Sequence, residues 1–113
     1  MPSDNRDPSQ LAIERRKYRR VRLITQVQCV ALGREDQLVM RDISPGGILI
    51  ATQTPYPADS EVDVSFSLPP TDRRVSCRGR VSYAIEGCCM GVEFGELSEE
   101  SCQALKTFVD EAK

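Results

Sequence analysis

Residues 61–94 read EVDVSFSLPPTDRRVSCRGRVSYAIEGCCMGVEF, and this stretch decides the fold. Apolar and polar side chains alternate through residues 61–68, as they do in a strand that has one face in a core. Pro69 and Pro70 end that strand, because proline has no N–H group to donate to a sheet. The alternation resumes in a long strand, one face of which carries Val75, Cys77, Gly79, Val81 and Tyr83. A hairpin at residues 85–87 leads into a strand over residues 88–94, so three successive strands are predicted.

Three more strands are predicted upstream, over residues 21–30, 37–43 and 48–52. The Ser-Pro-Gly-Gly sequence of residues 44–47 marks a tight turn between the second and third. Ser98 is a helix N-cap followed by two glutamates, and the apolar stripe behind it consists of Cys102, Leu105, Val109 and Ala112, with Phe108 beside it. We therefore expect a mainly β fold: a six-stranded antiparallel barrel over residues 23–95 and a C-terminal helix over residues 98–112.

The N-terminal region differs from the rest of the chain in charge. Residues 1–22 hold seven basic and three acidic residues, a balance of +4, which leaves −6 on the remainder because the whole chain carries −2. We expect residues 1–12 to be a disordered tail and residues 13–22 to be a basic arm that meets an anionic partner. The alternative is a solvated segment that only aids solubility.

The composition excludes several classes of function. The chain has 113 residues, enough for one domain, and no histidine, which excludes Ser-His-Asp catalysis, Cys-His catalysis and histidine-containing metal sites. It has no P-loop pattern and no compact carboxylate cluster, so we expect neither an enzyme nor a cofactor. No apolar run approaches the roughly 20 residues of a spanning helix, and the polar N-terminus is not a secretory signal. We therefore expect a cytoplasmic protein without membrane insertion.

The five cysteines are odd in number and show no C-x-x-C spacing, so we expect reduced thiols that mostly pack as small apolar side chains. Cys88 and Cys89 are adjacent, and on a strand their sulfur atoms should point to opposite faces. Of the six aromatic residues, Phe66, Phe94 and Phe108 are expected in the core.

Two short motifs carry the functional signal. The first is Arg-x-x-x-Arg, present as Arg16 to Arg20 and, one residue earlier, as Arg15 to Arg19. Each guanidinium offers a planar fork of donors that suits a phosphate or the O6 and N7 atoms of guanine. The pattern is weak by itself, because the segment is rich in arginine.

The second motif is DISPGG at residues 42–47, which fits [D/N]-x-S-x-x-G. Asp42 only accepts hydrogen bonds, which suits guanine N–H groups, whereas Ser44 can donate or accept. Gly46 and Gly47 allow a tight turn with its backbone close to a ligand. Together the two motifs predict a site for a guanine nucleotide with phosphates. The alternative is an ordinary turn in which Asp42 and Ser44 bond to their own backbone.

The order of these features resembles the PilZ domain, a family of bacterial receptors for cyclic di-GMP. The resemblance covers residues 14–112 and includes both motifs, their spacing, the GVEF sequence of residues 91–94 and the helix start at residues 97–100. It implies a split barrel with a terminal helix over residues 13–113. It also implies a set of ligand-binding residues: Arg15, Arg16, Arg20, Asp42, Ser44, Gly46 and Gly47.

The same resemblance implies an adaptor that signals to an unidentified downstream protein and regulates motility or biofilm formation. We expect the arm to be mobile without cyclic di-GMP and to fold over it on binding. The alternative is a small β-barrel that binds nucleic acid or protein and not cyclic di-GMP. The acidic body and the scarcity of aromatic residues argue against a nucleic-acid polymer as the partner.

Overall fold

In the computed structural model, residues 19–70 and 72–112 are described. Six strands form a closed barrel and a helix follows them, which confirms the predicted fold class. The elements are β1 (Val21–Ala31), β2 (Arg34–Ser44), β3 (Gly47–Ala51), β4 (Glu61–Leu68), β5 (Arg73–Ile85), β6 (Cys89–Phe94) and α2 (Glu99–Glu111). The expected tail of residues 1–12 and arm residues 13–18 lie outside the described residues.

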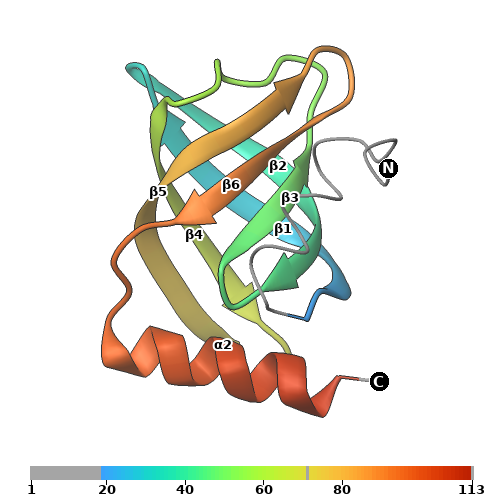
Figure 1. Ribbon diagram of the computed structural model, residues 1–113, viewed down its shortest axis with the longest axis vertical. Coiled ribbons are helices and arrows are strands. Elements are labelled where there is room, and N and C mark those ends of the chain that lie inside the picture. Colours follow the sequence, from blue (N-terminus) through green and yellow to red (C-terminus); the bar gives the residue numbers. More distant parts are fainter. Residues whose placement is uncertain (1–18, 71, 113) are drawn as a thin grey trace, which may run out of the picture.

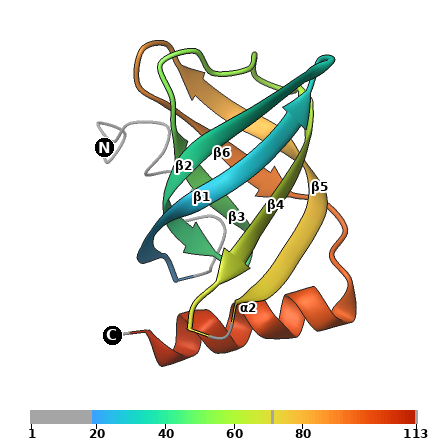
Figure 2. The same cartoon turned by 180° about the vertical axis from the view of Figure 1, so that it is seen from behind.

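The strands follow the order β1-β2-β3-β6-β5-β4, and every neighbouring pair is antiparallel. The barrel closes where β1 pairs with β4, through residues 28–30 and 63–65 alone (Figures 1 and 2). Pairing of β3 with β6 joins distant parts of the chain, and the Phe94 N–H donates to the Gly46 carbonyl at 2.9 Å. The turn of the second motif is therefore held against the GVEF strand.

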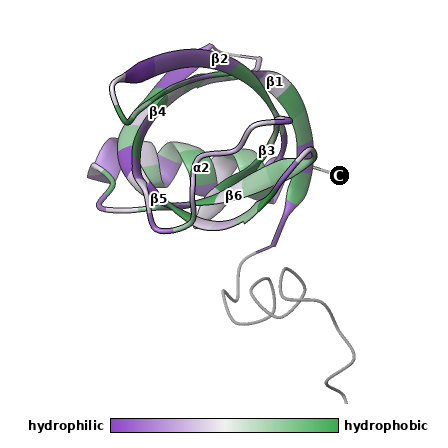
Figure 3. Cartoon of the chain, turned by 90° about the horizontal axis from the view of Figure 1, so that it is seen from above, coloured by the Kyte–Doolittle hydropathy of each residue, from purple (hydrophilic) through white to green (hydrophobic). Residues whose placement is uncertain are grey.

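The inner faces of the strands form one apolar core. The alternation of residues 61–68 is confirmed, since Val62, Val64, Phe66 and Leu68 are buried while their neighbours are exposed or half-buried. Phe66 packs on Phe94 with ring centres 6.2 Å apart and planes inclined by 20°. The view along the barrel in Figure 3 shows the closed ring of strands around this core.

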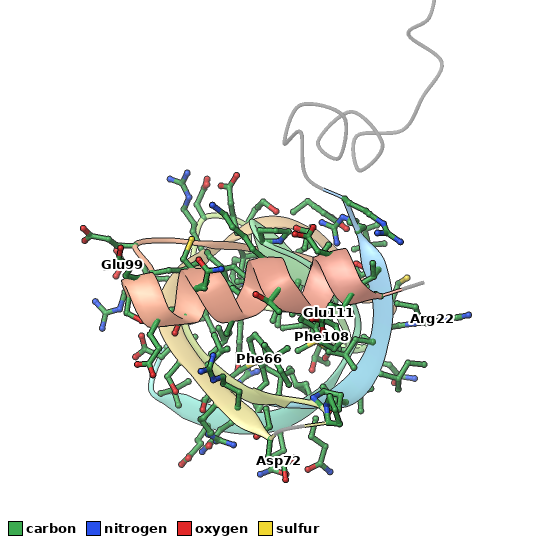
Figure 4. The ribbon with its side chains drawn as sticks, turned by 90° about the horizontal axis from the view of Figure 1, so that it is seen from below. Arg22, Phe66, Asp72, Glu99, Phe108 and Glu111 are labelled. Carbon is green, nitrogen blue, oxygen red and sulfur yellow. The ribbon has the colours of Figure 1, made fainter. Side chains whose placement is uncertain are left out.

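The helix α2 begins as its sequence predicts. The Ser98 hydroxyl accepts a hydrogen bond from the Ser101 N–H at 3.0 Å, which satisfies one of the free donors of the first turn. Leu105 and Val109 of the predicted stripe are buried, together with Ala104, which the stripe did not include. Figure 4 shows that α2 crosses the lower end of the barrel.

The loop from residue 52 to residue 60 contributes a core residue that the sequence did not indicate. Tyr56 is only 1% exposed, and its hydroxyl donates to the Asp36 carboxylate at 2.7 Å. The guanidinium of Arg34 lies 5.1 Å from the centre of the Tyr56 ring and 3.2 Å from Asp36. The Tyr56 hydroxyl, helped by Arg34, lowers the pKa of Asp36 below its ordinary value of 3.8.

Because the pKa of Asp36 is lowered in the folded state, Asp36 should contribute to the decrease of the free energy of unfolding in acid. A carboxylate whose pKa is lower in the folded state stabilises the fold above its unfolded pKa and loses that effect as the pH falls through its folded pKa. We expect the free energy of unfolding to fall less steeply below about pH 4 in Tyr56→Phe than in the wild type. Urea unfolding at several values between pH 2 and pH 7 measures this, and equal slopes in both proteins would contradict it.

None of the five cysteines is in a disulfide, and Cys29 is the only one of them that is fully buried. Burial raises the pKa of Cys29 to about 12 and that of Cys77 to about 11, so both stay protonated near neutral pH. The expectation that the sulfurs of Cys88 and Cys89 diverge is wrong, because they lie 3.5 Å apart. The reason is local: Cys88 is in the turn before β6, where the alternation of a strand does not apply.

Candidate functional site

The two sequence motifs meet on the outer face of the barrel. Arg20 immediately precedes β1, and one of its terminal nitrogens forms an ion pair with the Asp42 carboxylate on β2. The pairing of Arg22 with Asp42 across β1 and β2 brings these segments together. The ion pair is partly enclosed, with 14% of the Arg20 side chain and 27% of the Asp42 side chain exposed. The Nε atom of Arg20 is buried without a hydrogen-bond partner.

A cavity of about 390 Å³ adjoins this ion pair. Its walls are formed by Arg20, Val21, Arg22, Arg41, Asp42 and Leu49. Three of these six residues are arginines and one is acidic, so the walls carry an excess of positive charge. An anion with a hydrogen-bonding edge fits such walls, because guanidinium groups bind phosphates and a carboxylate accepts N–H groups.

Asp42 reaches this outer face because β2 contains a bulge. Met40 pairs with Ile50 and Asp42 pairs with Leu49, so two steps along β2 match one step along β3. Without the extra residue Asp42 would share the inner face with Met40. In the structure Ile43 is fully buried in its place, and Asp42 lines the cavity. Bulges of this kind redirect a side chain, here toward the candidate site.

Ser44 occupies a different position from Asp42. It is fully buried, and its hydroxyl accepts a hydrogen bond from the Gly46 N–H at 3.1 Å. This is the local bond that an ordinary turn predicts for the serine, whereas Asp42 pairs with Arg20 instead. Gly47 pairs with Ser44 at the start of β3, so Ser44 and the two glycines shape the turn beside the cavity.

The structure separates the two possible positions of the arginine motif. Arg20 turns to Asp42, whereas Arg19 turns away and donates to the backbone of α2. Of the two possible motif positions, Arg15–Arg19 and Arg16–Arg20, only the second has a last arginine that contacts the second motif. Arg15 and Arg16 themselves lie outside the described residues.

Sequence reasoning missed part of this surface. Strand pairing forms one row across five strands, which consists of Arg22, Asp42, Leu49, Gly91 and Tyr83. Asp42 on β2 and Tyr83 on β5 are separated by three steps between neighbouring strands. At about 4.8 Å a step, their backbones lie about 14 Å apart along the sheet. The row extends the outer face beyond the cavity to the far side of β6. The signal for it lies in the strand register and not in any single motif.

Tyr83 stands on a face other than the predicted one. Val81 pairs with Val92 and Tyr83 with Gly91, so β5 contains an extra residue here and its later side chains change faces. A Cβ atom on Gly91 would lie 2.3 Å from Cε1 of Tyr83, which shows that the tyrosine ring covers Gly91. The prediction that Tyr83 shares a face with Val81 is therefore wrong. Its ring borders the outer row, and a side chain larger than glycine at position 91 would displace it.

The fold and this surface define a small β-barrel domain with an arginine–aspartate site on its outside. The family model described as PilZ domain matches residues 14–111, and the chain belongs to that family. PilZ domains are generally non-catalytic receptors for cyclic di-GMP. No curated protein matches the sequence at a significant level.

Solved structures share the fold. The Bacillus subtilis inhibitor of motility matches with a TM-score of 0.75 and 22% identity, over 85% of this chain and 49% of that one. The Borreliella burgdorferi PlzA protein, solved in complex with c-di-GMP, matches with a TM-score of 0.64 and 12% identity, over 89% of this chain and 44% of that one. The PilZ domain of CeSA from a cellulose-synthesizing bacterium matches with a TM-score of 0.61 and 14% identity, over 81% of this chain and 95% of that one. The chain thus spans about half the length of the first two proteins.

Two further observations concern the described part of the chain. No helix within it is long and apolar enough to cross a membrane. Within residues 19–70 and 72–112, no three histidine, cysteine or acidic side chains are grouped so that they could hold a metal ion.

Proposed function

We propose that this chain is a cytoplasmic receptor for cyclic di-GMP that signals to a partner protein by rearranging its N-terminal arm. The observation that carries the proposal is the ion pair of Arg20 with Asp42, which joins the two motifs at one cavity. Family membership supports the choice of ligand. The downstream protein is unidentified, and control of motility or biofilm formation is the process that the family suggests.

Each residue has a distinct part in the proposed complex. Asp42 keeps acceptor positions beyond the one used by Arg20, and these take the N–H groups of a guanine edge. Arg20 donates to a phosphate or to guanine through its terminal nitrogens. Arg16, with Arg15 next to it, reaches the ligand from the arm. Ser44, Gly46 and Gly47 hold the turn against β6 and so fix the position of Asp42.

The entropy cost of ordering the arm gives a role to the contacts of Arg19 and Arg20, the two described residues just before β1, which we call the arm root. Micromolar binding needs about 8 kcal/mol, and ordering five arm residues costs on the order of 5–10 kcal/mol in backbone entropy. The contacts of Arg19 and Arg20 fix two residues of the arm root before any ligand arrives, which lowers that cost. The rearrangement presents a changed surface to the partner.

A panel of nucleotides tests the proposal by thermal unfolding. A hundredfold excess of ligand over its Kd stabilises the fold by about 2.7 kcal/mol, which corresponds to a rise in Tm on the order of 10 °C. We expect this rise with cyclic di-GMP and not with cyclic di-AMP or GTP. Adenine lacks the adjacent N1–H and N2–H donors that guanine offers to a carboxylate such as Asp42, and GTP has a single base. Asp42→Ala should abolish the rise.

Asp63→Ala is the control, because Asp63 is also an acid paired with an arginine, Arg78, but is more exposed than Asp42 and lies on β4. It should keep the rise in Tm. Equal rises with all three nucleotides would contradict a guanine-specific site. Binding of random oligonucleotides that weakens steeply with salt would favour the nucleic-acid alternative instead.

A further inference from the structure

Arg19 connects the arm to the opposite end of the chain. Its guanidinium donates to the Val109 carbonyl at 3.4 Å and to the Ala112 carbonyl at 3.0 Å. Both acceptors belong to the C-terminal end of α2, about 90 residues further along the chain. Arg19 and Arg20 are thus neighbours with opposite attachments, one to the helix and one to the candidate site.

The end of α2 needs such a cation. The carbonyls of the last helical turn carry partial negative charge and lack the usual helical N–H partners, although the Val109 carbonyl accepts a hydrogen bond from the Ala112 N–H at 3.3 Å. The last turn of α2 has no basic residue, and Asp110 and Glu111 add negative charge to it. Negative side chains are unfavourable here, because the C-terminal end of a helix dipole is itself negative. Arg19 supplies from the arm the positive charge that the last turn of the helix lacks.

The same end of α2 borders a cavity larger than the one at Asp42. This cavity, about 600 Å³ in volume, lies between α2 and the turn that joins β4 to β5. Phe108, Glu111 and Ala112 form the helix side of it, and Leu68, Pro69 and Pro70 form the barrel side. Figure 4 shows Phe108 and Glu111 at this lower end of the barrel. Fraying of the last helical turn would therefore remove one wall.

We propose that Arg19 couples the arm to α2, so that nucleotide capture orders the last turn of the helix and the cavity wall beside it. The coupling rests on the proposed binding of cyclic di-GMP, whereas the hold of Arg19 on α2 does not. A ligand that fixes Arg20 and the preceding residues also fixes Arg19 against Val109 and Ala112. The effect is reciprocal, because any contact that the ligand strengthens must in turn strengthen ligand binding. The order of residues 108–112 then depends on whether the arm holds a nucleotide, so this surface differs between the free and the bound protein.

Hydrogen exchange of the α2 amides tests this, in the wild type and in Arg19→Ala, Arg19→Lys and Arg74→Ala. Arg74 is the control, because it is an exposed arginine whose guanidinium donates to Ser67 on β4 and not to α2. Without nucleotide, we expect exchange of the amides of residues 109–112 to be about two- to tenfold faster in Arg19→Ala than in the wild type. The exchange rates of Arg19→Lys should lie between these two, because lysine keeps the positive charge but lacks the planar set of N–H donors that lets a guanidinium bond two carbonyls.

With cyclic di-GMP, exchange at residues 109–112 should slow in the wild type and stay unchanged in Arg19→Ala, which should bind the nucleotide about two- to tenfold more weakly. Equal exchange in wild type and Arg19→Ala without nucleotide would overturn the hold of Arg19 on α2. A wild type that binds cyclic di-GMP without slowing these amides would overturn the coupling alone. A wild type that does not bind at all would refute the proposed function and leave the nucleotide-free comparison standing.

Discussion

Arg20→Ala is expected to weaken cyclic di-GMP binding by at least about a hundredfold. A hydrogen bond to a charged group contributes about 1.5–3 kcal/mol, and a bidentate arginine–guanine pair discriminates by about 1–3 kcal/mol. The substitution also removes the partner of Asp42, whose carboxylate is only 27% exposed. Isothermal titration of the variant against the wild type measures the loss, because a hundredfold change in Kd is about 2.7 kcal/mol.

Arg74→Ala is the control for this experiment, because it removes the same charge from β5, far along the chain from both motifs. It should bind cyclic di-GMP as the wild type does. The far-ultraviolet circular dichroism of Arg20→Ala should match the wild type, because the side chain contributes nothing to the apolar core. Unchanged affinity in a folded Arg20→Ala protein would place the ligand somewhere other than the Asp42 cavity.

Phe66→Ala is expected to destabilise the fold by about 3–5 kcal/mol, the usual cost of deleting a buried aromatic side chain. Phe66 is 1% exposed and stacks on Phe94, and it therefore joins β4 to β6, the strand against which the turn of the second motif is held. Domains of this size have a free energy of unfolding of only about 5–15 kcal/mol. Urea unfolding should accordingly show a much lower midpoint, and at the upper end of the effect the domain is unfolded at 37 °C.

Phe66→Leu gives a milder version of the same test, because it keeps most of the apolar volume and should cost less than about 2 kcal/mol. It should stay folded and keep its affinity for cyclic di-GMP, since Phe66 faces the core and the Asp42 cavity lies on the outer face. A midpoint for Phe66→Ala equal to that of the wild type would contradict the role of Phe66 in the core.

Patterns within single segments could be predicted from the sequence. The alternation of residues 61–68 identified its buried face, because strand side chains follow a period of two. The cap at Ser98 and the stripe with Leu105 and Val109 located α2, because helical caps and faces are local in sequence. The convergence of the two motifs also followed from their chemistry, and the structure pairs Arg20 with Asp42.

Features that depend on the register between strands could not be predicted in this way. The bulges in β2 and β5 turn Asp42 and Tyr83 to the outer face, and a bulge exists only relative to a partner strand. The burial of Tyr56 depends on how a loop folds over the barrel. The bond from Arg19 to Ala112 joins residues more than 90 positions apart, so no local pattern signals it. The different contacts of Arg19 and Arg20 likewise join segments that are distant in sequence, so the sequence alone left both positions of the arginine motif open.

The most direct test of the central claim is calorimetric titration of the wild-type chain with cyclic di-GMP at two temperatures, since binding that is thermally silent at one temperature gives heat at another. We expect saturable binding with a Kd in the micromolar range or below, which corresponds to a binding free energy of about 8 kcal/mol or more. The double variant Arg16→Ala/Arg20→Ala should give no binding heat. Absence of heat from the folded wild type at both temperatures, with ligand at several hundred micromolar, would contradict the proposed receptor function.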